Sequence, residues 1–288
     1  MTGWPAITEP GLLERLALDD AGFDAFVVSL TAQLSAREFG PDQLAHAVGY
    51  PWSRPARSYR LRGSRVELLD DIAPDERAVL LSRLPEGRSP LLAFGSNAAP
   101  SALERKFAHF PGEEDRTVVV VAGHLHDFDV GAAAQPTVYG SLPATLFPSP
   151  GTAVRAAILW VTPAQFTQLA WSEISYHLGR LSTPFRADEP GLAFDDVLAF
   201  ASRFGAFSPE GRTVALAAVP ARARTAPALT QQELLDVAAV MALGPGSRAE
   251  DLVRAVFEDM AGLTPKLAAT VRRAAVPFAS DRWTPFPG

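Results

Sequence analysis

Cysteine is absent from the 288-residue chain, which excludes disulfides, thiolate nucleophiles and cysteine-ligated zinc. Any nucleophile or acid/base group must therefore use oxygen or nitrogen. The sequence also has no apolar stretch long enough to span a bilayer, and its first five residues show no basic segment followed by an apolar run. We therefore expect a cytoplasmic protein that does not associate with a membrane.

Positive charge is also in short supply. The formal net charge is -6 and the isoelectric point is about 5.4, which argues against binding to nucleic acid, because that needs a clustered positive surface. The local exception is a group of arginines beside two aromatic residues: Arg54, Arg57, Arg60, Arg62 and Arg65, with Trp52 and Tyr59. Two interpretations are open for this group, a site for an acidic ligand or the solvated face of a hairpin.

Turn-forming residues are plentiful, with 25 prolines and 21 glycines, so many short elements are expected. Periodicity predicts one or two helices over 9–36 with a break at Gly22, two short strands over 57–69 and a helix over 73–84. Further strands are predicted at 90–94, 117–122, 154–161 and 213–219, and further helices at 100–107, 163–171, 230–243, 247–260 and 264–275. The expected organisation is an N-terminal helical and hairpin extension (1–88), a core (89–226) and a C-terminal helical extension (227–288).

One segment of the core, residues 91–100, reads as a buried strand, an abrupt turn at Gly95-Ser96-Asn97 and a helix start. Backbone N–H groups can converge in such a turn, where they suit a carboxylate or an oxyanion. The same tripeptide is also ordinary turn chemistry. A second segment, 138–146, contains Tyr139 and Gly140 and could form another wall of the same cavity.

A third segment follows the helix predicted over 163–171. The sequence marks the start of this helix clearly, because Thr162 is the expected N-cap and Gln165 completes a capping box. Just beyond the end of this helix come Glu173 and Tyr176. Glu173 is the only acidic residue between Asp129 and Asp188. A carboxylate beside aromatic residues can serve as a general base if it is buried. The alternative interpretation is an ordinary glutamate on the protein surface.

A rival constellation lies at the end of a predicted strand, in His124-Leu125-His126-Asp127-Phe128-Asp129. Strand alternation places His124 and His126 on one face, which would suit a metal-assisted hydrolase. The two aspartates are at the wrong offsets for that motif, and no other histidine pair completes a ligand set.

Taken together, the Phe94-Gly95-Ser96-Asn97 turn after an apolar strand, and Glu173 with Tyr176 downstream, resemble the gamma-glutamylcyclotransferase-like superfamily. The hallmark of that superfamily is a Tyr-Gly-Ser-Asn turn and a later Glu-Gly with a nearby tyrosine. The resemblance covers residues 89–222. This chain departs from the pattern at Phe94, which lacks the tyrosine hydroxyl, and at Ile174, which replaces the glycine after the glutamate.

The resemblance implies an α+β fold with a small mixed β-barrel core and helical N- and C-terminal extensions. It implies release of 5-oxoproline from a gamma-glutamyl amine or peptide, with no metal and no organic cofactor. Glu173 would be the acid/base group. The implied substrate-binding residues are Phe94, Gly95, Ser96, Asn97, Tyr139, Gly140 and Tyr176.

Two other functions remain open at this point. One is a non-catalytic small-molecule-binding module of the same fold, which the Ile174 departure allows. The other is the metal-assisted hydrolase that uses His124 and His126. The helical extensions are expected to contact a protein partner or a second copy of the chain.

Overall fold

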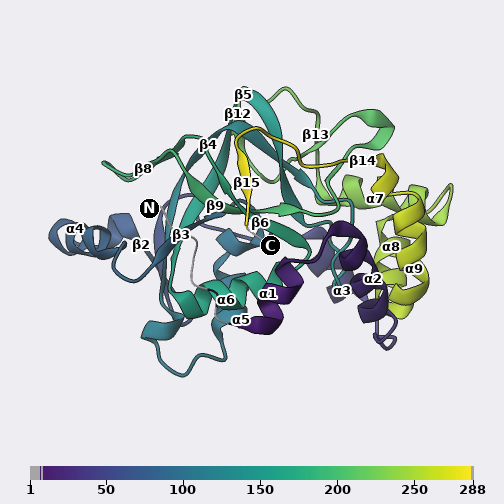
Figure 1. Cartoon of the computed structure of the whole chain (residues 1–288), viewed down its shortest axis with the longest axis horizontal. Coiled ribbons are helices and arrows are strands. Elements are labelled where there is room, and N and C mark those ends of the chain that lie inside the picture. Colours follow the sequence, from purple (N-terminus) through teal and green to yellow (C-terminus); the bar gives the residue numbers. More distant parts are fainter. Residues whose placement is uncertain (1–6, 8, 287–288) are drawn as a thin grey trace.

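The protein is an α+β structure in which one large mixed sheet is surrounded by helices (Figure 1). The structure is a computed structural model that describes residues 7 and 9–286. The α-helices are α1 (Pro10–Leu16), α2 (Asp20–Thr31), α3 (Pro41–Val48), α4 (Pro74–Arg83), α5 (Pro100–Phe107), α6 (Pro163–Ser172), α7 (Gln231–Leu243), α8 (Ala249–Glu258) and α9 (Met260–Ala269). In the described part of the chain, no helix is both long and apolar enough to cross a membrane.

The strands vary greatly in length. They are β1 (Tyr59–Arg62), β2 (Arg65–Leu68), β3 (Ser89–Ala93), β4 (Val118–Ala132), β5 (Ala144–Val161), β6 (Tyr176–Leu181), β7 (Phe185–Ala187), β8 (Ala193–Phe194), β9 (Val197–Ser202), β10 (Ala206–Phe207), β11 (Ala215–Leu216), β12 (Ala221–Arg222), β13 (Ala228–Leu229), β14 (Ala275–Val276) and β15 (Trp283–Pro285). The 3-10 turns among the described residues are η1 (Leu69–Asp71), η2 (Ser96–Ala98), η3 (Glu114–Arg116), η4 (Pro209–Gly211) and η5 (Arg272–Ala274).

The main sheet has 13 strands, and its central path runs β13-β11-β4-β5-β3-β9-β6-β15. β1, β7 and β12 pair at its sides, and β10 with β14 forms a separate two-stranded sheet. Along the described strands this path does not return to its starting edge. The expected small mixed β-barrel is therefore wrong, because the strands form an open sheet. The α+β class is confirmed.

The antiparallel β4–β5 pair joins the two longest strands of the sheet, and it contains a bulge. The bulge lies between His126 and Phe128. Asp127 there has a φ of 62°, in the left-handed region that aspartate tolerates better than most residues. Its carboxylate accepts hydrogen bonds from the Gly151 amide at 2.9 Å and from Arg282 at 2.7 Å. The bulge is thus stabilised by its own side chain and bends the strand.

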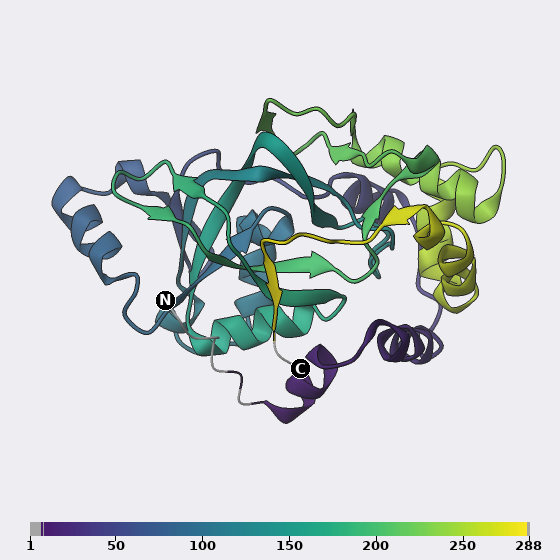
Figure 2. The same ribbon diagram turned by 45° about the horizontal axis from the view of Figure 1, so that its top comes forward.

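Both predicted extensions contribute strands to the central sheet. The β1–β2 hairpin joins the sheet through β1 and β4, with Tyr59 opposite Val120. At the other end of the chain, β15, drawn in yellow in Figure 2, pairs with β6 as the last strand of the central path. The division at residues 88 and 226 stays a prediction, but the segments on either side of it share one sheet.

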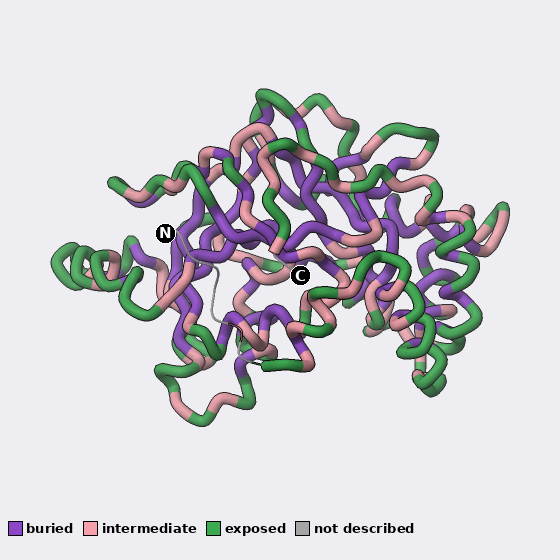
Figure 3. Tube along the Cα trace, viewed as in Figure 1, coloured by how far each residue is buried: buried purple, intermediate pink, exposed green. Residues whose placement is uncertain are grey.

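The buried residues concentrate in the sheet and in the helices that pack on it, whereas α4 projects from one end of the molecule (Figure 3). In α4, no residue is buried. Helices α7, α8 and α9 gather at the opposite end, next to α2 and α3 (Figure 1). Leu252, Val253 and Val256 of α8 are fully buried there, as expected for an apolar stripe at helical spacing.

Candidate functional site

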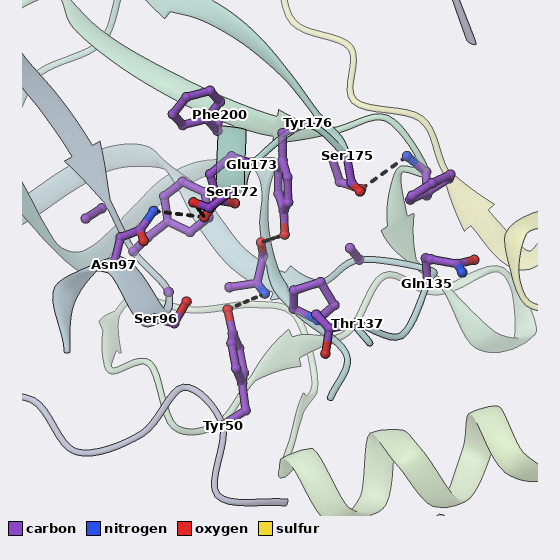
Figure 4. Close-up of a pocket in the computed structure, with 18 of the residues that line it drawn as sticks. Tyr50, Ser96, Asn97, Gln135, Thr137, Ser172, Glu173, Ser175, Tyr176 and Phe200 are labelled. Carbon is purple, nitrogen blue, oxygen red and sulfur yellow. Dashed lines mark hydrogen bonds between the residues drawn. The ribbon is translucent and has the colours of Figure 1, made fainter. Parts of the chain in front are cut away.

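One cavity of about 340 Å³ lies where the turn after β3 meets the end of α6 (Figure 4). This volume falls within the range typical of small-molecule sites. Its lining includes seven of the eight residues that the sequence singled out as catalytic or substrate-binding: Phe94, Gly95, Ser96, Asn97, Tyr139, Glu173 and Tyr176. Gln135, Thr137, Ser175 and Ser202 line its neutral polar side.

Glu173 is held in this cavity by the Gly95 turn and by α5. Its Oε1 accepts hydrogen bonds from Asn97 Nδ2 at 3.1 Å and from Lys106 Nζ at 2.9 Å, and Lys106 also donates to Asn97 Oδ1 at 2.6 Å. The Glu173 and Lys106 side chains are each 14% exposed. Among the described residues, no donor contacts Oε2. One carboxylate oxygen is therefore fixed, and the other is left for a ligand.

Helix α6 sets the position of this carboxylate. The predicted capping box is present, with both reciprocal bonds between Thr162 and Gln165, at 3.2 and 3.0 Å. Glu173 is the C-cap, and its amide donates to Leu169 and Ala170. Ile174 packs against an apolar cluster and is not part of the cavity lining.

Position 95 must be glycine because the Tyr50 side chain lies too close for a larger residue. A Cβ atom at this position would lie 2.6 Å from the Tyr50 hydroxyl and 2.9 Å from the Ala144 Cβ, closer than real side chains come. The amides of Ser96 and Asn97 open η2, so they have no acceptor within it. Phe94 lacks a hydroxyl, but Tyr50 brings one to the turn from another part of the chain.

Tyr50 and Tyr176 approach the backbone of Ala144 from opposite sides (Figure 4). The Tyr50 oxygen accepts from the Ala144 amide at 2.8 Å, whereas the Tyr176 hydroxyl donates to the Ala144 carbonyl at 2.9 Å. Burial raises the pKa of both phenols well above the usual range. Burial and the charge of Glu173 raise the pKa of Tyr139 to about 12. All three side chains thus stay neutral at physiological pH.

The remaining sequence-predicted residues lie outside the cavity lining. Gly140 has a φ of 88° and packs behind Tyr139 against Val253 of α8, where a Cβ atom would lie 2.8 Å from a methyl group. His124 and His126 are in β4, near its bulge. Burial lowers the pKa of His124, and the positive charge of Arg155 lowers it further. In residues 7 and 9–286, no three histidine, aspartate or glutamate side chains come together as metal ligands.

Four of the five arginines of the β1–β2 region have partners within the protein. Arg57 pairs with Asp70, Arg60 with Glu67 and Arg62 with Glu113. Arg54 instead donates to the Phe94 carbonyl at 3.0 Å, and burial lowers its pKa. This supports the hairpin interpretation over an acidic-ligand site.

Three of the cavity residues that were not singled out from the sequence carry a phenol or a positive charge: Tyr50, Arg105 and Lys106. Lys106 is one of only two lysines in the chain, beside 24 arginines. That rarity was the one sequence signal that could have pointed to Lys106, since a rare lysine on the helix that follows the turn suggests a specific contact. Tyr50 carried no such signal, because its place depends on tertiary packing of the N-terminal segment.

Comparisons with known proteins give little beyond the geometry. No protein-family model matches the chain, and no curated protein matches it. Among solved structures, the chain is similar to that of YkqA from Bacillus subtilis, with 12% identity and a TM-score of 0.30 over 74% of this chain. The match spans 63% of the length of YkqA. Similarity at this level defines neither the fold nor the function of the chain.

Proposed function

We propose that the cavity binds a gamma-glutamyl compound and releases 5-oxoproline from it by intramolecular aminolysis. The observation that carries this proposal is the contact between Asn97 and Glu173, which are 76 positions apart. It unites the turn and the carboxylate that the gamma-glutamylcyclotransferase-like pattern pairs. The open Oε2 of Glu173 faces no other donor in the described part of the chain, which leaves it for an amine.

The reaction needs one group that both accepts and returns a proton. The neutral α-amine of the substrate attacks its own γ-carbonyl carbon, and Glu173 Oε2 accepts the proton that this nitrogen loses. The bond between the γ-carbonyl carbon and the departing nitrogen then breaks, and Glu173 delivers the proton to that nitrogen. The products are 5-oxoproline and a free amine. Such acid/base catalysis contributes roughly a hundred- to ten-thousand-fold.

The tetrahedral intermediate carries its negative charge on the former carbonyl oxygen. We assign the amides of the Gly95 turn and the Tyr50 hydroxyl, which line the cavity, as the donors to this oxygen. Each oxyanion donor contributes about 3 kcal/mol in a preorganised site. Lys106 fixes Oε1, so that Glu173 presents Oε2 in one orientation.

The proposal is tested with Glu173→Gln, because the amide keeps the shape of the side chain and cannot accept the α-amine proton. We expect turnover to fall by about a hundredfold or more while ligand binding is retained. Release of 5-oxoproline from a panel of gamma-glutamyl amines and dipeptides measures turnover, and calorimetry measures binding. Glu104→Gln, on the exposed face of α5, is the matched control.

A second candidate is a binding protein that holds a gamma-glutamyl group without turnover. It is favoured by the ion pair between Lys106 and Glu173 at 2.9 Å, which neutralises the carboxylate in the resting site. Wild-type protein that binds the panel and never yields 5-oxoproline would establish this alternative. A Glu173→Gln variant with nearly wild-type turnover would reject the acid/base role.

A further inference from the structure

Gln135 lies in the loop that follows β4 and is one of the neutral polar residues that line the cavity. The backbone just before it is held in place, because the amide of Ala133 donates to the Pro143 carbonyl at 2.7 Å. Gln135 is only 6% exposed. In Figure 4 it lies on the opposite side of Tyr176 from Glu173. Gln135 therefore borders a part of the cavity that is separate from the proposed acid/base group.

The side-chain amide of Gln135 is oriented by Arg272, which belongs to η5 near the C-terminus. Arg272 Nε donates to Gln135 Oε1 at 3.1 Å. A guanidinium carries donors only, so the end of the amide that faces it must be the oxygen. This contact fixes an orientation that the shape of an amide alone leaves ambiguous. The nitrogen Nε2 must then occupy the other position.

Arg272 is itself held by contacts from two other parts of the chain. Its Nη1 forms an ion pair with Asp24 of α2. Its guanidinium carbon lies 4.0 Å from the centroid of the Phe204 ring, and Phe204 also lines the cavity. The Arg272 side chain is 12% exposed. The guanidinium cannot turn away from Gln135 without losing both the ion pair and the ring contact.

The Nε2 atom of Gln135 is an unused donor. In the described part of the chain, no acceptor contacts it, and it is not enclosed, unlike Nη2 of Arg272. Gln135 borders the cavity that contains Glu173, whereas Arg272 borders a neighbouring cavity of about 240 Å³. The free N–H groups of Gln135 therefore face the space in which a ligand of the Glu173 cavity would lie.

We infer that Gln135 is a ligand-binding residue and that Arg272 is a positioning residue, which holds the Gln135 amide so that Nε2 donates to an oxygen of the ligand. This inference rests on the proposed function for the ligand, a gamma-glutamyl compound, whose carboxylate and carbonyl oxygens are acceptors. Since Gln135 lies apart from Glu173, its hydrogen bond contributes to binding and not to the proton transfers. Asp24 and Arg272 come from the two ends of the chain, so both ends act on the cavity through one amide.

Two substitutions test the contact of Gln135 with the ligand. Gln135→Leu removes the amide, whereas Gln135→Glu keeps an acceptor for Arg272 and loses only the donor. We expect each to weaken binding of gamma-glutamyl-alanine by roughly tenfold, the loss of about one hydrogen bond to the ligand. Calorimetry measures binding, and thermal unfolding checks that Gln135→Glu retains the fold. In turnover the loss should appear in KM, with kcat nearly unchanged.

The positioning role of Arg272 is tested separately. Arg272→Met frees the Gln135 amide to present either end, so we expect a smaller loss of affinity, roughly threefold. The double variant Arg272→Met/Gln135→Leu should bind as well as Gln135→Leu alone, because Arg272 acts on the ligand only through Gln135. Arg272→Lys should restore part of the affinity. Arg273→Met, at the exposed next position of η5, is the matched control and should leave binding unchanged.

Nearly wild-type affinity in Gln135→Leu and Gln135→Glu would reject the ligand contact and leave the proposed function standing. Additive losses in the double variant would reject the positioning role, since Arg272 would then act by a route other than Gln135. Binding that depends on Gln135, without any release of 5-oxoproline by the wild type, would support the inference and reject catalysis. A wild type that binds no gamma-glutamyl compound would reject both.

Discussion

At the scale of single residues, Tyr50 joins the N-terminal segment to the cavity chemistry. The Tyr50 hydroxyl oxygen accepts a hydrogen bond from the Ala144 amide and lies against Gly95. The hydroxyl proton of Tyr50 is therefore available to donate into the cavity. The Tyr176 hydroxyl is already committed to the Ala144 carbonyl. The two phenols therefore differ in availability although they approach the same peptide.

Tyr50→Phe tests whether this free proton serves the reaction. Loss of one donor to a developing oxyanion costs roughly a hundred- to a thousandfold in kcat, with a smaller effect on KM. Tyr176→Phe is the comparison, because its proton is used by the backbone. Steady-state kinetics and thermal unfolding should be measured together. Equal losses of kcat in the two variants, tracking equal losses of stability, would assign Tyr50 a structural role only.

The sequence alone could indicate the Gly95 turn and the Glu173 carboxylate of the candidate site. It could not indicate the residues from other elements that surround them. Gly95, Asn97 and Glu173 could be found because turn chemistry and a lone carboxylate are local signals. Tyr50 and Arg105 could not be placed, since nothing local shows that the segment before β1 folds back over the turn. The bond from Lys106 to Glu173 likewise depends on how α5 packs beside α6.

At the scale of elements, helices with explicit start signals were predicted well. α4, α5 and α6 lie within a residue or two of their predicted bounds. Gly22 was expected to break a helix, and Gly262 lies between two of the predicted helices. Gly22 instead lies inside α2 and Gly262 inside α9, where the amide of each donates to an aspartate at 2.7 and 2.9 Å, respectively. Glycine near an N-terminus is a weak helix breaker when its N–H finds such a partner.

The strands were predicted less completely. β4 and β5 extend well beyond the expected 117–122 and 154–161, whereas 213–219 yields only the two-residue β11. The added length includes His124, His126 and Pro148, which have little strand propensity. Pairing across a long hairpin, with one bulge to absorb the mismatch, overrides local preference there.

The capping box of α6 gives a prediction at this scale. Thr162→Ala removes the side-chain acceptor for the Gln165 amide and should lower the free energy of unfolding by about 1 kcal/mol. Urea denaturation measures it. Thr167→Ala, which removes a bond to the Pro163 carbonyl on the same helix, is the control and should cost less. A loss no greater than that of the control would show that the cap contributes nothing measurable.

At the scale of the whole molecule, a buried ion pair connects the central hairpin to the loop that leads into the C-terminal helices. Asp129 of β4 is fully buried and accepts from Arg224 at 2.7 and 2.8 Å. Arg224 also donates to the Val219 carbonyl at 2.7 Å. Asp129 was singled out with the neighbouring histidines, but its partner is this arginine.

Arg224→Met should lower the free energy of unfolding by about 3–5 kcal/mol, because it leaves the Asp129 carboxylate buried without its counter-charge. Asp129→Asn in the same protein should recover part of that loss by removing the uncompensated charge. Arg222→Ala, at an exposed position two residues away, is the control and should change stability by no more than about 0.5 kcal/mol. Chemical denaturation measures all three. Similar costs for Arg224→Met and Arg222→Ala would refute a stabilising role for the pair.

The cavity depends on three stretches of chain that are far apart in sequence. Tyr50 comes from the segment before β1, Glu173 from the middle of the chain, and Val253 of α8 supports Gly140 from behind. A chimera that transplanted residues 89–226 into another protein would carry the carboxylate and the turn but neither support. A change in ligand preference can therefore arise by mutation in any one of the three stretches.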